Sequence, residues 1–243
     1  MKSFLLFVFS TGIFSTTFSQ DFKYEAGIES GYSIVSLRGD QFSKKFQAEN
    51  KVDYTTKISV PVGVSLQCNF KKVLSFRTGI YFENKGNILQ LSSTMSETSD
   101  IKYLTLPLML RASYGAKAKV FAELGPSFSY LIKHTVDYNY YTYDTAFAVV
   151  FFSPTTTDYT DHLKKMDVGL SMGMGIGFTV KKQFSISLEW RGNMGMSDIN
   201  NYSASSPGYY REGKIQTGAT HFLIGVAYKF GDVPPPYEYQ PTI

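Results

Sequence analysis

Two carboxylates at strand spacing are the first residues in this chain that could do chemistry. Glu25 and Glu29 lie in a segment whose polar and apolar residues alternate, so their side chains point to the same face of a strand. Two carboxyl groups on one face could act as general acid and general base. Carboxylates that face basic residues across a narrow interior form ion pairs instead, and we expect this structural role here.

A hydrolase site around His221 is the second candidate. His221 falls on the polar face of its segment, among serines and acidic residues, so a Ser/His/Asp arrangement is conceivable. The sequence contains no G-x-S-x-G nucleophile elbow. We therefore expect a protein that is not an enzyme.

The sequence offers less support for metal or redox chemistry than for acid–base or hydrolase chemistry. His134, His162 and His221 are too dispersed to form a ligand motif, and the single cysteine, Cys68, excludes an intramolecular disulfide. Five methionines fall on apolar faces, where we expect lipid-facing side chains rather than a copper site: Met166, Met172, Met174, Met194 and Met196. The sequence predicts no cofactor and no metal.

The elements that position these residues are eight segments with strict alternation of apolar and polar residues. They begin at Phe22, Ile58, Leu74, Leu104, Val120, Met166, Phe184 and Thr220. Their apolar faces hold no charged residue, although 18% of the chain is charged. A Lys or Arg facing lipid at the middle of a bilayer costs roughly 2–4 kcal/mol, so this exclusion is typical of strands whose apolar face meets lipid.

The connections between the segments alternate between long and short. They run approximately over residues 35–56, 71–73, 83–103, 115–119, 133–165, 179–183 and 197–219. This alternation favours an all-β fold, an eight-stranded antiparallel up-and-down transmembrane β-barrel with short periplasmic turns, long outer loops and periplasmic termini. Pro107 lacks a ladder donor, so we expect a bulge or a local distortion there.

A soluble lipocalin-like barrel is the alternative fold, because it too has eight antiparallel strands behind a signal peptide. It would turn its apolar face inward. The first segment lacks the Gly-x-Trp signature, and the only tryptophan, Trp190, lies in the seventh segment. Membrane fractionation would separate the two folds.

The two ends of the chain differ in character from the barrel. Residues 1–19 have the basic start, apolar stretch and small-x-small site of a secretory signal peptide, which leaves residues 20–230 for the barrel. Residues 231–243 contain Pro234, Pro235 and Pro236 and are predicted to be a periplasmic Pro-rich tail. A net charge of +4 is too small to indicate a nucleic-acid partner.

The polar faces carry ten charged residues that an eight-stranded barrel would enclose: Glu25, Glu29, Arg77, Glu83, Arg111, Glu123, Asp167, Glu189, Arg191 and Lys229. Charges in so narrow a lumen must pair or stay hydrated, and we expect a salt-bridged plug. A short turn after Tyr114 makes Arg111 and Glu123 direct cross-strand neighbours, so we predict that they pair. Small inward residues near Gly173 and Gly175 either leave a water pocket or make room for Glu189 and Arg191.

The connection over residues 133–165 is rich in aromatic residues. It holds Tyr138, Tyr140, Tyr141, Tyr143, Phe151 and Phe152, which we interpret as a possible extracellular contact loop. Long connections of this kind are often functional. The same stretch could instead be strands that continue beyond the membrane as a stable hairpin.

Several short motifs resemble the PorT-like outer-membrane β-barrel proteins of Gram-negative bacteria. They are Tyr103-Leu104-Thr105-Leu106-Pro107-Leu108, Glu123-Leu124-Gly125-Pro126, Asp167-Val168-Gly169, Glu189-Trp190-Arg191 and Gly195-Met196-Ser197-Asp198-Ile199. The resemblance covers nearly the whole mature chain. It implies an integral outer-membrane location and a link to protein secretion, and it brings no catalytic residues.

Two functions remain open from the sequence. The first is a non-enzymatic structural or interaction protein, a monomeric barrel in outer-membrane lipid whose outer loops or tail contact a protein partner. The second is a small-molecule channel or receptor, which needs a continuous hydrated lumen. Conductance in planar bilayers distinguishes them.

Overall fold

The chain folds into one antiparallel sheet that closes on itself. The computed structural model describes residues 23–39, 42–43, 47–49, 53–70, 73–92, 95–115, 118–144, 149–181, 183–201 and 213–230. The strands are β1 (Lys23–Arg38), β2 (Asp53–Ser59), β3 (Val62–Asn69), β4 (Leu74–Ser92), β5 (Met95–Gly115), β6 (Ala118–Asp144), β7 (Val149–Asp158), β8 (Met166–Lys181), β9 (Phe184–Gly195) and β10 (Gln216–Phe230). The predicted signal peptide and Pro-rich tail lie outside the described residues.

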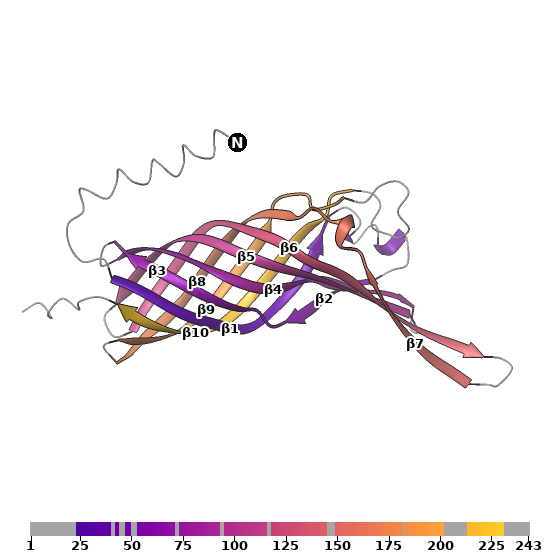
Figure 1. The fold of residues 1–243 in the computed structure, drawn as a ribbon, viewed down its shortest axis with the longest axis horizontal. Coiled ribbons are helices and arrows are strands. Elements are labelled where there is room, and N and C mark those ends of the chain that lie inside the picture. The colour runs from indigo at the N-terminus through magenta and orange to yellow at the C-terminus, as the bar shows by residue number, and fades with distance from the viewer. Residues whose placement is uncertain are drawn as a thin grey trace, which may run out of the picture.

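Ten strands make eight positions around the ring. β2 and β3 pair with β1 in one continuous register, from Ser33 with Ser59 to Lys23 with Asn69, so together they occupy one position that is interrupted at Pro61. β7 pairs with β6 alone and continues outward from the ring. Pairing of β10 with β1, from Arg38 with Gln216 to Tyr24 with Phe230, closes the barrel (Figure 1). The fold predicted from alternation is therefore correct.

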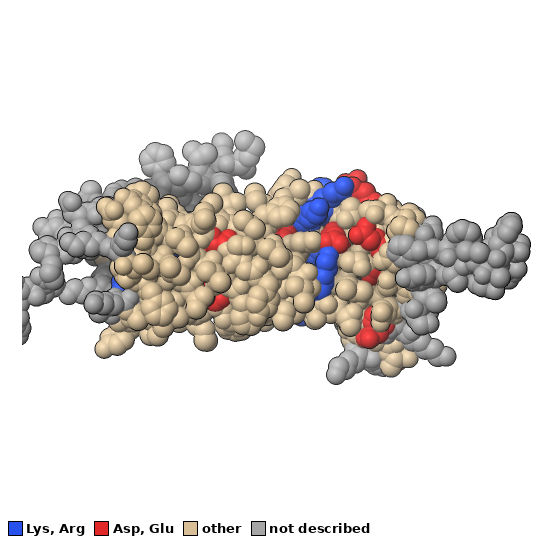
Figure 2. Space-filling model, turned by 90° about the horizontal axis from the view of Figure 1, so that it is seen from below, with Lys and Arg blue, Asp and Glu red and all other residues tan. Residues whose placement is uncertain are grey.

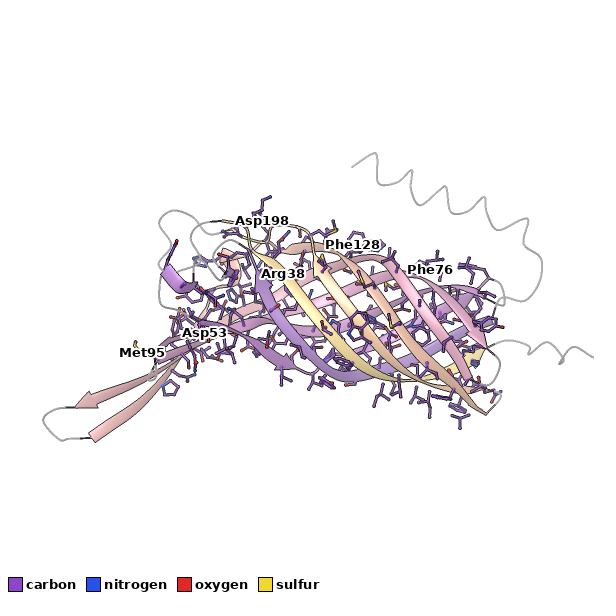
Figure 3. All side chains as sticks on the ribbon, turned by 180° about the vertical axis from the view of Figure 1, so that it is seen from behind. Arg38, Asp53, Phe76, Met95, Phe128 and Asp198 are labelled. Carbon is purple, nitrogen blue, oxygen red and sulfur yellow. The ribbon has the colours of Figure 1, made fainter. Side chains whose placement is uncertain are left out.

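The direction of the side chains follows the predicted parity. Val62 and Val64 are each 54% exposed on the outer wall, whereas Gly63 between them is buried and faces inward. Figure 3 shows Phe76 and Phe128 along the wall and Arg38, Asp53 and Asp198 toward one end. An apolar face turned outward and a charged face turned inward is the opposite of the lipocalin arrangement. No helix among the described residues is long and apolar enough to cross a membrane.

The two ends of the barrel are built differently. At one end, which we call the short-turn end, β3–β4, β5–β6 and β8–β9 are joined within a few residues, and β1 begins and β10 ends there (Figure 1). Exposed aromatic residues gather on the wall near this end, as an interfacial girdle requires: Tyr24, Phe70, Tyr114, Phe178, Phe184, Tyr228 and Phe230. The opposite end, which we call the loop end, carries the longer connections.

Much of what the sequence suggested to be long loops is strand. β4 and β5 run through residues 83–92 and 95–103, with only two residues between them, so the predicted connection over 83–103 is wrong. The 133–165 connection is a β6–β7 hairpin that projects beyond the other strands (Figure 1), followed by the short 3₁₀ helix η3 (Thr160–His162). Backbone pairing that continues past the membrane band needs no apolar face, which is why the alternation test ended these strands too early.

Pro107 produces only a local distortion. Pro107 pairs with Ser127 and Leu110 with Leu124 in the same register, and the two positions between them have no partner in the described β5–β6 ladder. The register shift in this pair of strands lies instead between Lys102 and Tyr103. A bulge at Pro107 is therefore not found.

Candidate functional site in the barrel lumen

A compact charge network crosses the middle of the lumen. It consists of Arg77 from β4, Arg111 from β5, Glu123 from β6, Glu29 from β1, and Glu189 and Arg191 from β9. All six side chains are buried, and Arg191 is only 1% exposed. We call these six residues the charge network. Because it contains three arginines and three glutamates, its formal charges cancel.

Glu189 is the hub of this network. Its Oε2 accepts hydrogen bonds from Arg77 Nη1 at 3.0 Å and from Arg111 Nη2 at 3.1 Å. Its Oε1 accepts one from Arg191 Nε at 2.6 Å. One carboxylate thus contacts all three guanidinium groups. Removing it would leave three buried cations to share two carboxylates.

The predicted pair forms as the register requires. Arg111 and Glu123 are direct cross-strand partners, and Arg111 Nε donates to Glu123 Oε2 at 2.6 Å. Glu123 also accepts from Arg77 Nη1, at 3.2 Å to Oε1. The Arg111 guanidinium stacks 3.7 Å from the centre of the Phe121 ring. A planar guanidinium group suits this combination of carboxylate pairing and ring stacking.

Glu29 connects β1 to β4 and β9, which lie two positions away on either side of it in the ring. Arg77 Nη2 donates to Glu29 Oε1, and Arg191 Nη2 donates to Oε2 at 3.3 Å. Tyr81 donates its hydroxyl to Glu29 Oε2 at 2.7 Å and places its ring 4.7 Å below the Arg191 guanidinium. Parity alone would have put Tyr81 on the inner face, but no motif or charge at this position marked it as part of a site.

Glycines on β8 make room for the carboxylates. A Cβ at Gly173 would lie 3.1 Å from Glu123 Cγ and 3.2 Å from Glu189 Oε1. A Cβ at Gly175 would lie 2.5 Å from the Phe121 ring. Gly173 therefore makes room for Glu189, as one of the two alternatives predicted, and for Glu123. Gly175 makes room for Phe121, which is not a member of the network.

A second polar layer lies between the charge network and the loop end. Glu83 accepts from Thr105 Oγ1 at 3.0 Å and from Asn193 Nδ2 at 3.3 Å, and Lys85 Nζ lies 3.7 Å from its Oε2. Asp167 accepts from Thr217 Oγ1 at 2.6 Å. Glu83 and Asp167 were predicted to join the interior charges, and the structure places them in this separate layer. Lys85 was not predicted to face the lumen, because it falls within the connection predicted over residues 83–103, which is strand in the structure.

His221 belongs to the same layer. Its Nδ1 lies 2.5 Å from Ser33 Oγ, and its Nε2 lies 3.0 Å from Asn193 Nδ2 and 3.6 Å from Glu83 Oε1. Ser33 and His221 are each 1% exposed. A serine, a histidine and a carboxylate do meet here, and all three are buried between the charge network and the loop end.

Glu25 and Lys229 lie apart from the network, near the short-turn end. They are cross-strand partners in the β1–β10 ladder. Glu25 accepts from Asn69 Nδ2 at 3.2 Å, and Lys229 donates to Thr179 Oγ1 at 3.0 Å. Glu25 and Glu29 therefore do not form the carboxylate pair that acid–base chemistry would need. No group of three His, Cys, Asp or Glu side chains suited to a metal occurs in the described part of the chain.

Apolar side chains close the loop end of the lumen. We call this cluster the apolar cap: Leu37, Phe42, Ile101, Tyr103, Leu131, Leu163, Ile199 and Ile215. Leu163 and Ile199 come from the β7–β8 and β9–β10 connections, which are tied together where Lys164 N donates to Ile199 O at 2.8 Å. Burial raises the pKa of Asp198, but hydrogen bonds from the amides of Ile215 and Asn200 outweigh it and hold this pKa below its usual value.

The half of the lumen toward the short-turn end is different. Its lining residues are small or polar and partly exposed, such as Ser65, Gln67, Gly177 and Ser187. This open half ends at the charge network. Only one of the predicted contact residues of the β6–β7 hairpin has a described side chain: the hydroxyl groups of Tyr138 and Tyr159 share a hydrogen bond of 2.9 Å. The side chains of the others lie outside the described part of the chain: Tyr140, Tyr141, Tyr143, Phe151 and Phe152.

Comparison with known proteins agrees with the geometry. The family described as outer membrane protein beta-barrel domain matches residues 18–201. The solved structure of the outer membrane protein OprG from Pseudomonas aeruginosa is similar, with a TM-score of 0.50 at 12% identity over 86% of this chain and 96% of that one. The outer membrane protein AlkL gives a TM-score of 0.46 at 11% identity over 92% and 96% of the two chains. At such identities the likeness shows the fold alone, and no curated protein matches.

Proposed function

Because the chain belongs to the outer membrane β-barrel domain family, we propose that it is a non-enzymatic membrane anchor that presents its loop end to a protein partner. The observation that carries this proposal is the neutral charge network, which spans the lumen from β1 to β6 and β9. A lumen closed by paired side chains passes no solute. The barrel then acts through the surfaces that it holds in place. The resemblance to PorT-like proteins makes secretion machinery one hypothesis for the partner.

The β6–β7 hairpin is the part of the loop end that fits partner contact. β6 pairs with β5 only as far as Tyr140, and β7 pairs with β6 alone among the described strands. Tyr159 N donates to His134 O at 2.9 Å, so even-numbered amides of β7 point to its open edge. Pro154 occupies one of these positions without an N–H, which protects the edge against indiscriminate strand pairing.

Conductance tests the proposal. We expect the purified protein, reconstituted in planar lipid bilayers, to give no sustained single-channel steps. As a matched control, a variant that lacks both closures, with Arg77, Glu189, Leu163 and Ile199 replaced by Ser, is expected to conduct. Steps of the wild-type protein as large as those of this variant would contradict the anchor function.

A cross-linking experiment tests whether the hairpin, rather than the rest of the barrel, contacts a protein partner. Replacing residues 141–152 by a two-residue turn leaves the β5–β6 pairing up to Tyr140 and the whole lumen unchanged. The shortened protein is expected to reach the membrane and to unfold like the wild type, but to lose cross-links from a photoreactive residue at position 154. Unchanged cross-links would exclude the removed part of the hairpin, residues 141–152, as necessary for the contact.

A small-molecule receptor is the second candidate, and the open half of the lumen favours it. Ser65, Gln67 and Ser187 offer hydrogen-bonding groups to a solute that enters from the short-turn end. In that case ligand binding would occur without conductance. Measured conductance would instead favour the channel alternative.

A further inference from the structure

Four lysines form a row at the boundary between the apolar wall and the loop end. They are Lys102 on β5, Lys133 on β6, and Lys164 and Lys165 just before β8, and we call them the basic row. The side chains of Lys133, Lys164 and Lys165 are 50%, 49% and 50% exposed. Figure 2 shows basic and acidic side chains gathered in this zone, next to the largely uncharged wall.

The residues next to the row on the membrane side are lipid-facing. The last outward-facing residues of the apolar wall before the loop end are Leu104 on β5, Ile132 on β6 and Met166 on β8, and all three are exposed. A lysine directly beyond such residues can lay its methylene groups on the apolar surface and extend its ammonium group to the polar interface. The basic row therefore lies at the depth of lipid headgroups.

A β-bulge turns Lys133 outward. Tyr103 pairs with Leu131 and Lys102 with Lys133, so Ile132 is the extra residue. Ile132 and Lys133 are both exposed, whereas Leu131 and His134 on either side are buried. In an uninterrupted strand Lys133 would have pointed into the lumen. Bulges commonly redirect a side chain in this way.

The bulge sets two like charges opposite each other. Lys102 and Lys133 are direct cross-strand partners, an arrangement that is unfavourable in isolation. The backbone of Lys165 lies beside the same stretch of β6, because Leu131 N, two residues before Lys133, donates to Lys165 O at 2.8 Å. An anion between these ammonium groups would remove their repulsion.

The acidic neighbours leave Lys102, Lys133 and Lys165 available, whereas Lys164 Nζ also donates to Asp198 O at 3.0 Å and is engaged there. Lys133, Lys164 and Lys165 lie 3.9, 3.5 and 3.7 Å from Asp158, Asp198 and Asp161. These separations exceed the roughly 2.7–2.9 Å of a charge-assisted hydrogen bond, and the pairs are solvent-exposed. Lys102 has no ion pair within the described residues. The acids lie on the side of the loop end, so the ammonium groups remain accessible from the membrane side.

From these contacts we propose that the basic row binds the phosphate groups of a membrane lipid whose acyl chains lie on the wall beneath it. Lysine is an effective point-charge partner for phosphate. The apolar residues directly below the row distinguish a lipid from free phosphate, because they provide the surface for the acyl chains. This inference does not depend on the proposed anchor function.

Native mass spectrometry of the detergent-solubilised protein tests the proposal with diphosphorylated lipid A as the probe. We expect K102Q/K133Q to weaken lipid A binding by roughly thirtyfold, in line with the loss of two interfacial charges. The matched control K119Q/K229Q removes the same charge at the short-turn end and is expected to bind like the wild type. K102R/K133R should retain binding, since it keeps the charge and guards against a folding defect.

The other outcomes overturn the proposal. Equal losses in K102Q/K133Q and K119Q/K229Q would show an unspecific charge effect. If inorganic phosphate displaced lipid A completely, or if phosphatidylcholine bound equally well and independently of the lysines, the site would not be one for a phosphorylated lipid. Lipid A binding by K102Q/K133Q at the wild-type level, with the Arg variant unchanged, would equally exclude it.

Discussion

The charge network and the apolar cap close the same lumen by different means. The network is made only by strand residues, and every member is held by the register of the wall. The cap combines strand residues with Leu163 and Ile199, which come from connections between strands. Electrostatic closure is therefore built into the barrel, whereas apolar closure depends on how the connections pack. The two should respond differently to substitution.

The largest effect is expected for Glu189→Ala. It leaves three buried arginines with two carboxylates, and breaking a buried ion pair costs roughly 3–5 kcal/mol. Guanidinium unfolding in lipid vesicles, followed by the fluorescence of Trp190, the only tryptophan, would measure this loss. Glu25→Gln is the control, since Glu25 lies outside the network and should change stability little. Equal effects of the two substitutions would show that the network has no special role in closure.

Ile199→Ala tests the cap. Ile199 is fully buried, and such truncations cost roughly 2–5 kcal/mol; we expect the lower half of this range because the connections can partly collapse. Faster hydrogen exchange at Leu163 and Ile215 should accompany the loss, while exchange in the middle of β9 stays slow. Conductance should remain absent, because the charge network still closes the lumen. Conductance in this variant would make the cap the essential closure.

Acid should loosen the loop end through His134, which lies beyond the membrane band at the base of the hairpin. Burial lowers the pKa of His134 to about 4. The unfolded segment, with an ordinary histidine, takes up its proton first as the pH falls below about 6.5, so stability decreases with acidification, by about 1.4 kcal/mol at pH 5.5. Hydrogen exchange of Val136 and Tyr159 at pH 7.5 and 5.5 would measure this. The pH effect should disappear in His134→Gln; its persistence would assign it to another group.

The smallest effect distinguishes two glycines of β8. Gly173→Ala crowds Glu123 and Glu189 at 3.1–3.2 Å, for a cost of about 1 kcal/mol. Gly177→Ala meets its nearest atoms at 3.9–4.0 Å and should be tolerated or slightly stabilising. The comparison of their unfolding midpoints tests whether β8 is glycine-rich for the sake of the network. Similar midpoints would favour a general role of these glycines in wall curvature.

Much of the barrel could be predicted from local pattern. Alternation placed Val62 and Val64 outward and Arg77 and Glu189 inward, because each strand residue points opposite to its neighbour. The same reasoning gave the Arg111–Glu123 pair, since one short turn fixes the register of adjacent strands. It failed for Lys85, and it left open whether residues 133–165 form a contact loop or the hairpin that the structure has. In both places strands continue beyond the membrane and lipid no longer imposes an apolar face.

Local pattern is enough to predict a barrel with lipid outside and charges inside, because a period of two is a property of each strand and lipid excludes charge from its outer face. The closed ring decided which charges meet: Arg77 contacts Glu29 and Glu189 because ring closure brings strands that are distant in sequence together around a narrow lumen. It also decided that Lys133 points outward, since one extra residue between two strands reverses the parity. Contacts across the lumen depend on strand tilt and register summed around the whole ring, and no single segment encodes that sum.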